Sequence, residues 1–398
     1  MARRINLEAL LAGCADDSFD DGIRIDTELV PLAGPGGPVK PAVYEGGAYQ
    51  TDRRWAAPGD AEATPVIVID NVPSQANRLE DALRRHRDST SIPELVLDLS
   101  KLEHLPAHLP RRLSSLQFPH RSADAYLRDA RFGDQDFIKT ELGRAIFGAT
   151  APACGPLMAW FPQALLYGFW QSHLGKKGHN SKHARAWVSE IIGWQPATTE
   201  TKVLGLKGDP LNLNTDEAVT SNPDDRTKWD VGKGERVEGG KNDKLSEIGH
   251  GQVPFMGADA TSASVSFARV TQRATVSFAQ LRRIGLGDRS VEADTAARAL
   301  LVALGLHAHQ LAFGRGFALR SGADLRPTAT TVTWLGSGGD EACDLGDADV
   351  TCELLRSARE HAESVKVPLD GWNEQPPVLL PKDNLLSAIR STWPELDD

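Results

Sequence analysis

Basic and histidine side chains gather in one stretch, residues 165–194, which reads LLYGFWQSHLGKKGHNSKHARAWVSEIIGW. It carries three histidines, and its cations are Lys176, Lys177, Lys182 and Arg185. No Asp or Glu occurs between Glu141 and Glu190, although the chain has a formal net charge of -10. A cationic loop without acids attracts phosphate groups even on an acidic protein, so this stretch is a candidate polyanion site.

A second stretch without acids runs from residue 261 to 287, and its four arginines are Arg269, Arg273, Arg282 and Arg283. Alternating apolar residues predict a strand over 263–281, from which Arg269 and Arg273 project. These arginines would contact phosphates, and Trp170 in the first stretch would stack on unpaired bases. A tryptophan at the end of an apolar run is otherwise a core residue, and both interpretations stay open.

Residues 64–70, TPVIVID, are the best strand in the sequence because four consecutive residues are β-branched and apolar. A helix follows, with Ser74 as its expected N-cap. Gln75, Asn77 and Arg78 then share a strand-to-helix turn with Ser74, and backbone N–H groups at such turns bind anions. Neither GxGxxG nor GxxxxGK is present, so a nucleotide cofactor is not indicated. Simple helix capping is the alternative.

Two further places hold candidate ligand contacts. Residues 119–132, PHRSADAYLRDARF, have helical spacing, and their polar face carries His120, Arg121 and Arg128. A solvated helix with internal ion pairs explains that face equally well. His250 lies between two glycines in SEIGHGQVPF, where the backbone can approach a ligand closely.

Size and composition are those of a soluble globular protein, with 398 residues, of which 40% are hydrophobic and 25% charged. The N-terminal run MARRINLEALL is neither a signal peptide nor a membrane span, so we expect a cytoplasmic location. The net charge of -10 argues against a protein that coats nucleic acid indiscriminately, while a local cationic groove remains compatible with it.

Neither a metal nor another cofactor is expected. The four cysteines are scattered without a CxxC pair, which is typical of buried free thiols. His179 and His183 are four residues apart, but HExxH is missing and the surrounding charges are cationic. His307 and His309 point to different faces of their predicted helix, so we expect core or surface histidines there.

The remaining elements predict a mixed α and β fold. Helices are expected at 7–14 and 292–313, and strands at 23–32, 92–99, 316–320 and 328–335. Residues 44–55 are expected to form a surface loop, 205–244 a mobile insertion and 328–398 an acidic C-terminal extension of a single elaborated domain spanning 1–398.

Six motifs occur in an order that resembles one known family. They are SQANRLEDAL at Ser74, PHRSADAYLRDA at Pro119, LLYGFWQSH…SKHARAWVSEIIGW at Leu165, GHGQVPF at Gly249, SVSFARVTQRATVSFAQLRRIGL at Ser264 and AARALLVALGLHAHQLAFGRGFALRS at Ala296. Over roughly residues 7–327 the chain is similar to the backbone subunit of type I-G (formerly I-U) CRISPR Cascade complexes, in the Cas-seven branch of the RAMP proteins.

The resemblance implies an α+β fold, a modified RRM-like (ferredoxin-like) palm with large insertions and a thumb-like hairpin. It implies a subunit without nuclease activity that lines up in several copies along one CRISPR RNA, while guide pairing recognises the DNA target. The implied partners are further copies, the large subunit, the repeat-handle-binding subunit and, indirectly, the helicase-nuclease. The residues expected to contact RNA are Ser74, Gln75, Asn77, Arg78, His120, Arg121, Arg128, Trp170, Ser172, His173, Lys176, Lys177, Lys182, Arg185, His250, Arg269, Arg273, Arg282 and Arg283.

The chain departs from the family pattern in the motif after its aromatic run. Gln171 and His173 stand where the family has Asp and Thr, and GKKGHNSKH replaces a glycine-rich stretch. Two alternatives stay open. One is a RAMP-type endoribonuclease that processes precursor CRISPR RNA, with His173 or His250 as acid or base. The other is an enzyme that binds a small phosphate compound at the turn of residues 74–78.

Overall fold

The largest feature of the fold is a nine-stranded sheet. The structure is a computed structural model that describes residues 3–45, 48–102, 105, 109–172, 174, 181–197, 211, 213–214, 216–234, 236–250, 264–372 and 375–391. Eight strands follow one another in space in the order β1 (Arg3–Arg4), β18 (Gly339–Asp344), β17 (Asp324–Gly336), β2 (Gly22–Pro31), β15 (Phe267–Ser277), β11 (Trp187–Pro196), β4 (Thr64–Asp70) and β3 (Thr51–Arg54). The ninth, β16 (Phe317–Ala318), pairs with β17.

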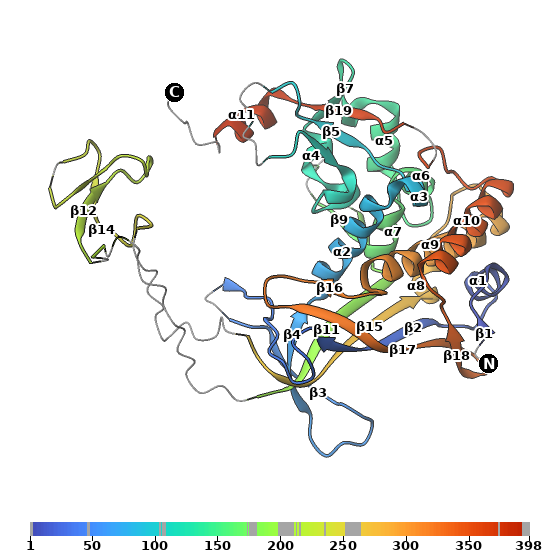
Figure 1. Ribbon diagram of the computed structural model, residues 1–398. Coiled ribbons are helices and arrows are strands. Elements are labelled where there is room, and N and C mark those ends of the chain that lie inside the picture. Colours follow the sequence, from blue (N-terminus) through green and yellow to red (C-terminus); the bar gives the residue numbers. More distant parts are fainter. Residues whose placement is uncertain are drawn as a thin grey trace.

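Four antiparallel strands, β17, β2, β15 and β11, form the centre of this sheet. Their chain order is β2, β11, β15, β17, so in space the fourth strand lies beside the first, then come the third and the second. Helix α2 (Val72–Arg85) precedes the second of these strands and α9 (Val291–Phe313) precedes the fourth. Figure 1 shows both helices on the same face of the sheet.

Helix α9 is the core of the helical layer. Its N-cap Ser290 accepts a hydrogen bond from the backbone N–H of Ala293. The alanine and leucine side chains of the helix are buried on nearly all of its sides. At Gly305 an added Cβ would lie 2.7 Å from the Trp187 ring, so the missing side chain lets α9 approach β11 closely. The helix is long and apolar enough to cross a membrane, but 83% of its most apolar window is buried inside the protein, as in a core helix.

The other helices cover the same face or build a second layer beyond it (Figure 1). They are α1 (Leu7–Cys14), α3 (Arg87–Thr90), α4 (Ala125–Arg128), α5 (Glu141–Gly148), α6 (Gly155–Trp160), α7 (Pro162–Tyr167), α8 (Phe278–Leu281), α10 (Ala348–Ser364) and α11 (Asp383–Ser391). One large cluster of buried apolar residues joins most of these helices to the sheet.

The C-terminal part of the chain is built into both layers. Strands β17 and β18 lie in the main sheet, and α10 packs on α9. A five-stranded sheet in the second layer has the order β6 (Arg112–Ser114), β5 (Val96–Asp98), β19 (Val378–Pro381), β7 (Ala130–Phe132) and β8 (Gln135–Asp136). Because β19 lies between β5 and β7, the segment after residue 328 completes a sheet whose other strands come from residues 96–136.

Within the insertion expected at 205–244, the described residues form a small antiparallel sheet of their own. Its strands are β12 (Ala218–Ser221), β13 (Trp229–Val231) and β14 (Lys241–Lys244), with β12 in the middle. The expected mobility of this insertion stays a prediction.

The structure corrects several local expectations. Asn71, one residue after β4, caps α2 by accepting the backbone N–H of Ser74, so Ser74 is not the N-cap. Residues 119–132 are not one helix but a 3-10 turn (Arg121–Ala123), the four-residue α4 and strand β7. Strand β3 occupies part of the loop expected at 44–55, and β5 is shorter than the strand expected at 92–99. All four cysteines are free, but only Cys14 and Cys154 are buried.

Candidate nucleic-acid interface

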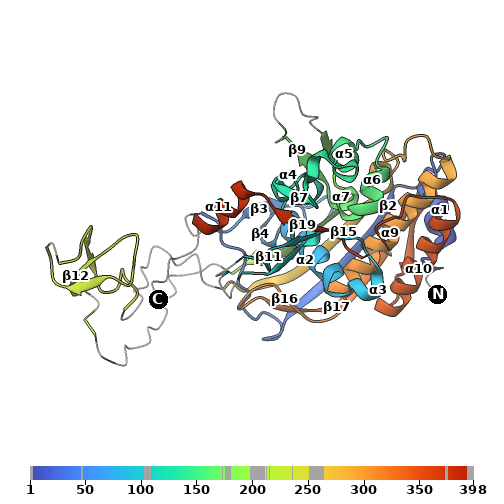
Figure 2. The same ribbon diagram turned by 90° about the horizontal axis from the view of Figure 1, so that it is seen from above.

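Trp170 and Lys182 face each other on a short hairpin that leaves the helical layer. Strand β9 (Phe169–Gln171) pairs antiparallel with β10 (Ser181–His183), and Trp170 lies opposite Lys182. The Lys182 Nζ lies 5.9 Å from the centre of the Trp170 ring, and the tryptophan is 66% exposed. Figure 2 shows β9 at the outer edge of the body, next to α4 and α5. The expectation that Trp170 presents an accessible ring therefore fits its position.

The inner side of the hairpin is fixed by His183. Its ring stacks on Phe169 at 5.9 Å, and its Nε2–H donates to the Leu165 carbonyl at 3.0 Å. Burial lowers the pKa of His183, which favours the neutral ring in this position. His183 therefore anchors the hairpin, whereas Lys182, its neighbour on the other face of β10, is exposed.

Arg121 contacts the start of the hairpin from inside the protein. Its side chain is 9% exposed. Its guanidinium forms a two-bond ion pair with Glu80 of α2 at 2.8 and 2.9 Å and donates a third bond to the Gly168 carbonyl at 3.1 Å. Its backbone adopts φ +54°, a conformation that is rare for arginine and that the buried ion pair compensates. Arg121 therefore positions the hairpin from inside the protein and does not face solvent.

Burial and opposite charge compete at this ion pair. Burial raises the pKa of the Glu80 carboxyl to about 7, and the Arg121 cation acts against that rise. Burial also lowers the pKa of Arg185, with a smaller contribution from the nearby Arg121 cation. The residue as a whole is nevertheless exposed and follows β10, so it adds a second cation near Lys182.

A second cationic group is organised by Asp70 at the end of β4. This buried carboxylate accepts hydrogen bonds from Ser74, from Gln75, from Arg78 at 2.9 and 3.1 Å and from Arg320 at 2.9 Å. Two guanidinium groups share one carboxylate, so the group keeps a positive excess. Gln75 is fully buried and also accepts a bond from Gln272 of β15 at 2.7 Å. Gln75 therefore ties α2 to the sheet rather than facing a ligand.

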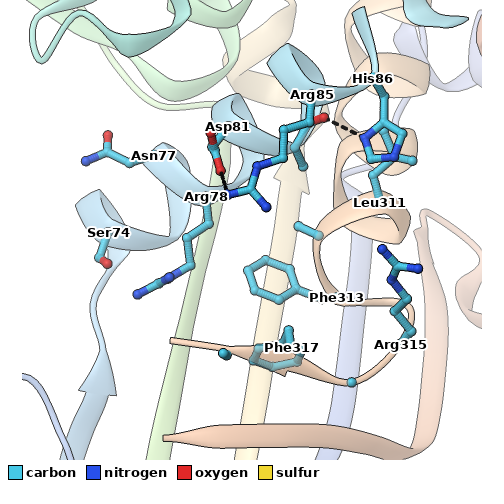
Figure 3. A pocket seen from close by; sticks show the side chains of 14 residues that line it. Ser74, Asn77, Arg78, Asp81, Arg85, His86, Leu311, Phe313, Arg315 and Phe317 are labelled. Atoms are coloured by element: carbon cyan, nitrogen blue, oxygen red, sulfur yellow. Dashed lines mark hydrogen bonds and ion pairs between the residues drawn. The ribbon is translucent and has the colours of Figure 1, made fainter. Parts of the chain in front are cut away.

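Ser74, Asn77 and Arg78 line a pocket of about 670 Å³ between α2 and the end of α9 (Figure 3). Its opposite wall holds Arg315, in the turn after α9, and Phe317, the first residue of β16. The sequence reasoning missed both residues. The signal available for them was the arginine between two glycines directly after a long buried helix, a turn at which the backbone and a cation can both approach a ligand.

Arg269 and Arg273 lie on the other face of the main sheet. Side chains alternate along β15, and Gln272 and Ala274 point into the helical layer, so Arg269 and Arg273 point away from it. Arg269 lies 5.1 Å from the centre of the Trp194 ring, and Arg273 donates to Asp26 at 2.6 Å. The two cationic stretches without acids therefore do not line one groove, because the alternation of side chains along β15 points Arg269 and Arg273 away from the face that carries the hairpin.

The remaining expected contacts are scattered. Arg282 donates to the carbonyls of Gly13 and Asp20, and Arg128 pairs with its neighbour Asp129. Three others are exposed but lie in three separate turns or loops: His120, His250 and Arg283. Ser172 follows β9, whereas His173, Lys176 and Lys177 lie outside the described residues.

The candidate contacts form two surfaces, the hairpin on one side of α2 and the pocket on the other. Arg78 lines the pocket, whereas Glu80, two positions later and therefore on nearly the opposite side of the helix, binds the base of the hairpin. Among the described residues no group of three His, Cys, Asp or Glu side chains is suited to hold a metal ion. What the two surfaces offer is positive charge, accessible aromatic surface and hydrogen-bonding groups, the features that bind single-stranded nucleic acid.

No curated protein matched the chain. Residues 23–197, which run from β2 to β11 and include α2 and the hairpin, match the family described as CRISPR-associated protein GSU0053, so this part of the chain is similar to that CRISPR-associated family.

Proposed function

We propose that the chain is a CRISPR RNA-binding backbone subunit of a type I effector complex of subtype I-G, and that several copies assemble along one guide. The observation that carries the proposal is the β9–β10 hairpin, in which an exposed tryptophan and a lysine lie together within the segment matched by a CRISPR-associated family. A ring that stacks on a base and a cation that binds the adjacent phosphate are the usual means of holding single-stranded RNA.

The centre of the main sheet supports an RRM-like palm. The strand order fourth, first, third, second, with one helix before the second strand and one before the fourth, is that of the ferredoxin-like βαββαβ unit. In this interpretation β2, β11, β15 and β17 are the four palm strands, and α2 and α9 are the two palm helices. The hairpin and most of the second layer are then insertions between the first and second strands, and β19 joins that layer from the segment after the fourth strand.

RNA contact is proposed on the helix side rather than on the open face of the sheet. On the open face, Arg273 is paired with Asp26 and Arg54 is paired with Glu190. These cations are already neutralised, and carboxylates among them repel phosphate groups. On the hairpin no carboxylate is paired with Lys182 or Arg185 among the described residues, and Lys176 and Lys177 belong to the same cationic stretch in the sequence.

In the complex this subunit would bind and orient the guide and leave sequence recognition to base pairing with the target DNA. The proposed partners are further copies of the chain in a head-to-tail arrangement, the large subunit and the repeat-handle-binding subunit. The proposal includes a cytoplasmic location and no chemical step on this chain.

The test reverses the charge of the cationic stretch around the hairpin. The variant Lys176→Glu, Lys177→Glu, Lys182→Glu is compared with a control in which three exposed lysines elsewhere, Lys101, Lys139 and Lys233, are exchanged for glutamate. RNA affinity is measured by fluorescence anisotropy over a range of salt concentrations. The proposal predicts that only the loop variant loses affinity and that its salt dependence becomes shallower by up to about two units of slope for the three cations, because each phosphate contact contributes about 0.7 units. Equal affinity of the two variants would contradict it.

A processing endoribonuclease is the second candidate, and one observation favours it. The exposed His250 ring lies 5.1 Å from the Trp229 ring, which places an imidazole beside a surface on which a base could stack. Incubation of the purified chain with repeat RNA in the absence of divalent metal separates the candidates. Cleavage that is lost in His250→Ala or His173→Ala would favour the nuclease, and uncleaved RNA would favour the binding subunit.

A further inference from the structure

The pocket between α2 and the turn after α9 has more cations than acids. Asp81 is the only carboxylate among its lining residues, and both Arg84 and Arg85 pair with it, at 2.7 and 2.6 Å. Asp70, next to the pocket, is likewise shared by two arginines, Arg78 and Arg320. Each carboxylate therefore leaves one cation uncompensated, and the pocket favours an anionic ligand.

Two guanidinium groups can reach that ligand. Arg78 uses its Nε and Nη2 atoms on Asp70 and the Leu319 carbonyl, while its Nη1 atom donates no bond among the described residues, and its side chain is 26% exposed. Arg315 is exposed and has no hydrogen-bond or ion-pair partner within the described part of the chain. A phosphate group at Arg315 would receive charge-assisted hydrogen bonds from a guanidinium that has no other partner among the described residues, and Arg78 adds positive charge on the opposite wall.

The floor of the pocket is aromatic. The rings of Phe313 and Phe317 meet edge to face with centroids 5.0 Å apart, and Figure 3 shows them between Arg78 and Arg315. Phe313 is buried, whereas Phe317 is only half-buried and so offers ring surface to the pocket. A flat aromatic base fits such a surface better than an aliphatic group does, because stacking adds to the removal of apolar area from water.

The rim supplies groups that recognise the edges of a base or the hydroxyls of a ribose. The His86 Nδ1–H donates to the Ala82 carbonyl at 2.9 Å, so its Nε2 atom is left as an acceptor in the pocket wall. The Asn77 side chain is exposed and offers both a donor and an acceptor. Cations, an aromatic surface and neutral hydrogen-bonding groups therefore occur together in a volume of about 670 Å³.

We infer that this pocket binds one nucleoside monophosphate unit, with its phosphate on Arg315 and its base on Phe317. The unit is either a free nucleotide or one nucleotide of an RNA chain, since the phosphate, ribose and base are the same in both. In its RNA form the inference rests on the proposed function and adds a contact on the side of α2 that does not face the hairpin.

The experiment uses the full chain and two variants whose changes are confined to the pocket. Arg315→Ala removes the cation that has no partner, and Phe317→Leu removes the ring while keeping an apolar side chain. Arg289→Ala is the control, because Arg289 is also an exposed arginine and precedes the other end of α9, about 35 Å away at about 1.5 Å per residue. Unchanged thermal unfolding shows that each variant is folded.

Binding of the four nucleoside 5′-monophosphates, of inorganic phosphate and of a fluorescent single-stranded RNA is then measured. The inference predicts that Arg315→Ala and Phe317→Leu each weaken nucleotide or RNA binding by about tenfold or more, the effect of one charge-assisted contact or one stacked base. Arg289→Ala should bind like the unmodified protein. Inorganic phosphate should bind more weakly than a nucleotide because it lacks the base.

The pattern of losses identifies the source of the nucleotide. A loss confined to RNA assigns the pocket to a nucleotide of the chain. Nucleotide binding by a protein that binds no RNA would support the pocket and contradict the proposed function. Two results would overturn the inference: affinities of Arg315→Ala and Phe317→Leu equal to those of Arg289→Ala, or binding of phosphate as tight as that of nucleotides with no effect of Phe317→Leu.

Discussion

The Lys182 ammonium group lies 5.9 Å from the centre of the Trp170 ring, and the two residues are directly opposite each other in the β9–β10 hairpin. A cation over an indole face is stabilised by the ring, and at an exposed site this contact contributes about 0.5–1 kcal/mol. The same pair presents a stacking surface and a charge to solvent, so the hairpin is better explained by a ligand than by stability alone.

The first prediction concerns this ring. Trp170→Ala should weaken binding of single-stranded RNA by about 1–3 kcal/mol, the contribution of one stacked base, while the free energy of unfolding changes by less than about 1 kcal/mol. Anisotropy titration and urea unfolding measure the two effects. Trp55→Ala is the matched control, because Trp55 is 61% exposed against 66% for Trp170 and lies next to β3. An equal loss of RNA binding in both variants would contradict a specific role for the hairpin.

The second prediction concerns the buried ion pair below the hairpin. Arg121→Met leaves the Glu80 carboxylate without its partner, and removal of one member of a buried pair costs about 3–5 kcal/mol of unfolding free energy. The double variant Glu80→Leu, Arg121→Met should recover a large part of this loss, because no buried charge remains. Chemical unfolding of the two variants checks this. A double variant as unstable as Arg121→Met would show that the bond to Gly168, which both variants lack, matters more than the charge balance.

The third prediction concerns the turn into β9. Gly168 has φ +76°, and an added Cβ would lie 2.8 Å from the His183 carbonyl oxygen. Gly168→Ala should therefore destabilise the hairpin by about 1–3 kcal/mol and weaken RNA binding with it. Gly133→Ala separates backbone strain from the contact, because Gly133 also has positive φ but nothing within 4 Å of an added Cβ. Similar melting temperatures of the two variants would contradict the close approach.

The fourth prediction is a pH dependence of stability. Burial lowers the pKa of His309 from about 6.5 to about 4, and that of His307 to about 4 with His86 adding to the effect. The unfolded chain therefore takes up protons first as the pH falls, so stability present above pH 6.5 is lost towards pH 4, by up to about 3 kcal/mol for His309. The variant His309→Leu should show a shallower fall of melting temperature over this range.

A control is needed because the contribution of Glu80 to stability changes with pH in the opposite direction. Its pKa is raised to about 7, so its contribution to stability is present below its ordinary pKa of 4.5 and is lost as the pH rises through 7. The difference between the curves of the unmodified protein and His309→Leu isolates the histidine. Parallel curves would show that His309 is not buried in its neutral form.

Local patterns in the sequence were sufficient for the elements that carry their own signals. The strand expected at 64–70 and the helix expected at 7–14 are confirmed with the same bounds, and the buried helix expected at 292–313 begins one residue earlier, at Val291. A run of four β-branched residues and an alanine–leucine helix are recognisable because burial on all sides leaves no polar face.

The candidate site could be predicted only in part, because its contacts connect distant parts of the chain. Arg121 pairs with Glu80, which is 41 residues away, and Arg320 reaches Asp70 over 250 residues. No local pattern specifies such partners, so a cation that faces solvent and one that is buried look alike in the sequence. The separation of Arg269 from the hairpin likewise depends on which face of β15 packs against α2, and only the sheet as a whole determines this.

The central claim is that this chain binds guide RNA, and the nucleic acid that copurifies with it tests the claim most directly. The chain is expressed together with its CRISPR locus and purified, and the nucleic acid is extracted and its length and sequence are determined. The account predicts RNA of one defined length that contains a spacer and is absent when Lys176, Lys177 and Lys182 are replaced by glutamate. Purified complex without RNA, or with RNA of random sequence and length that the variant retains, would contradict it.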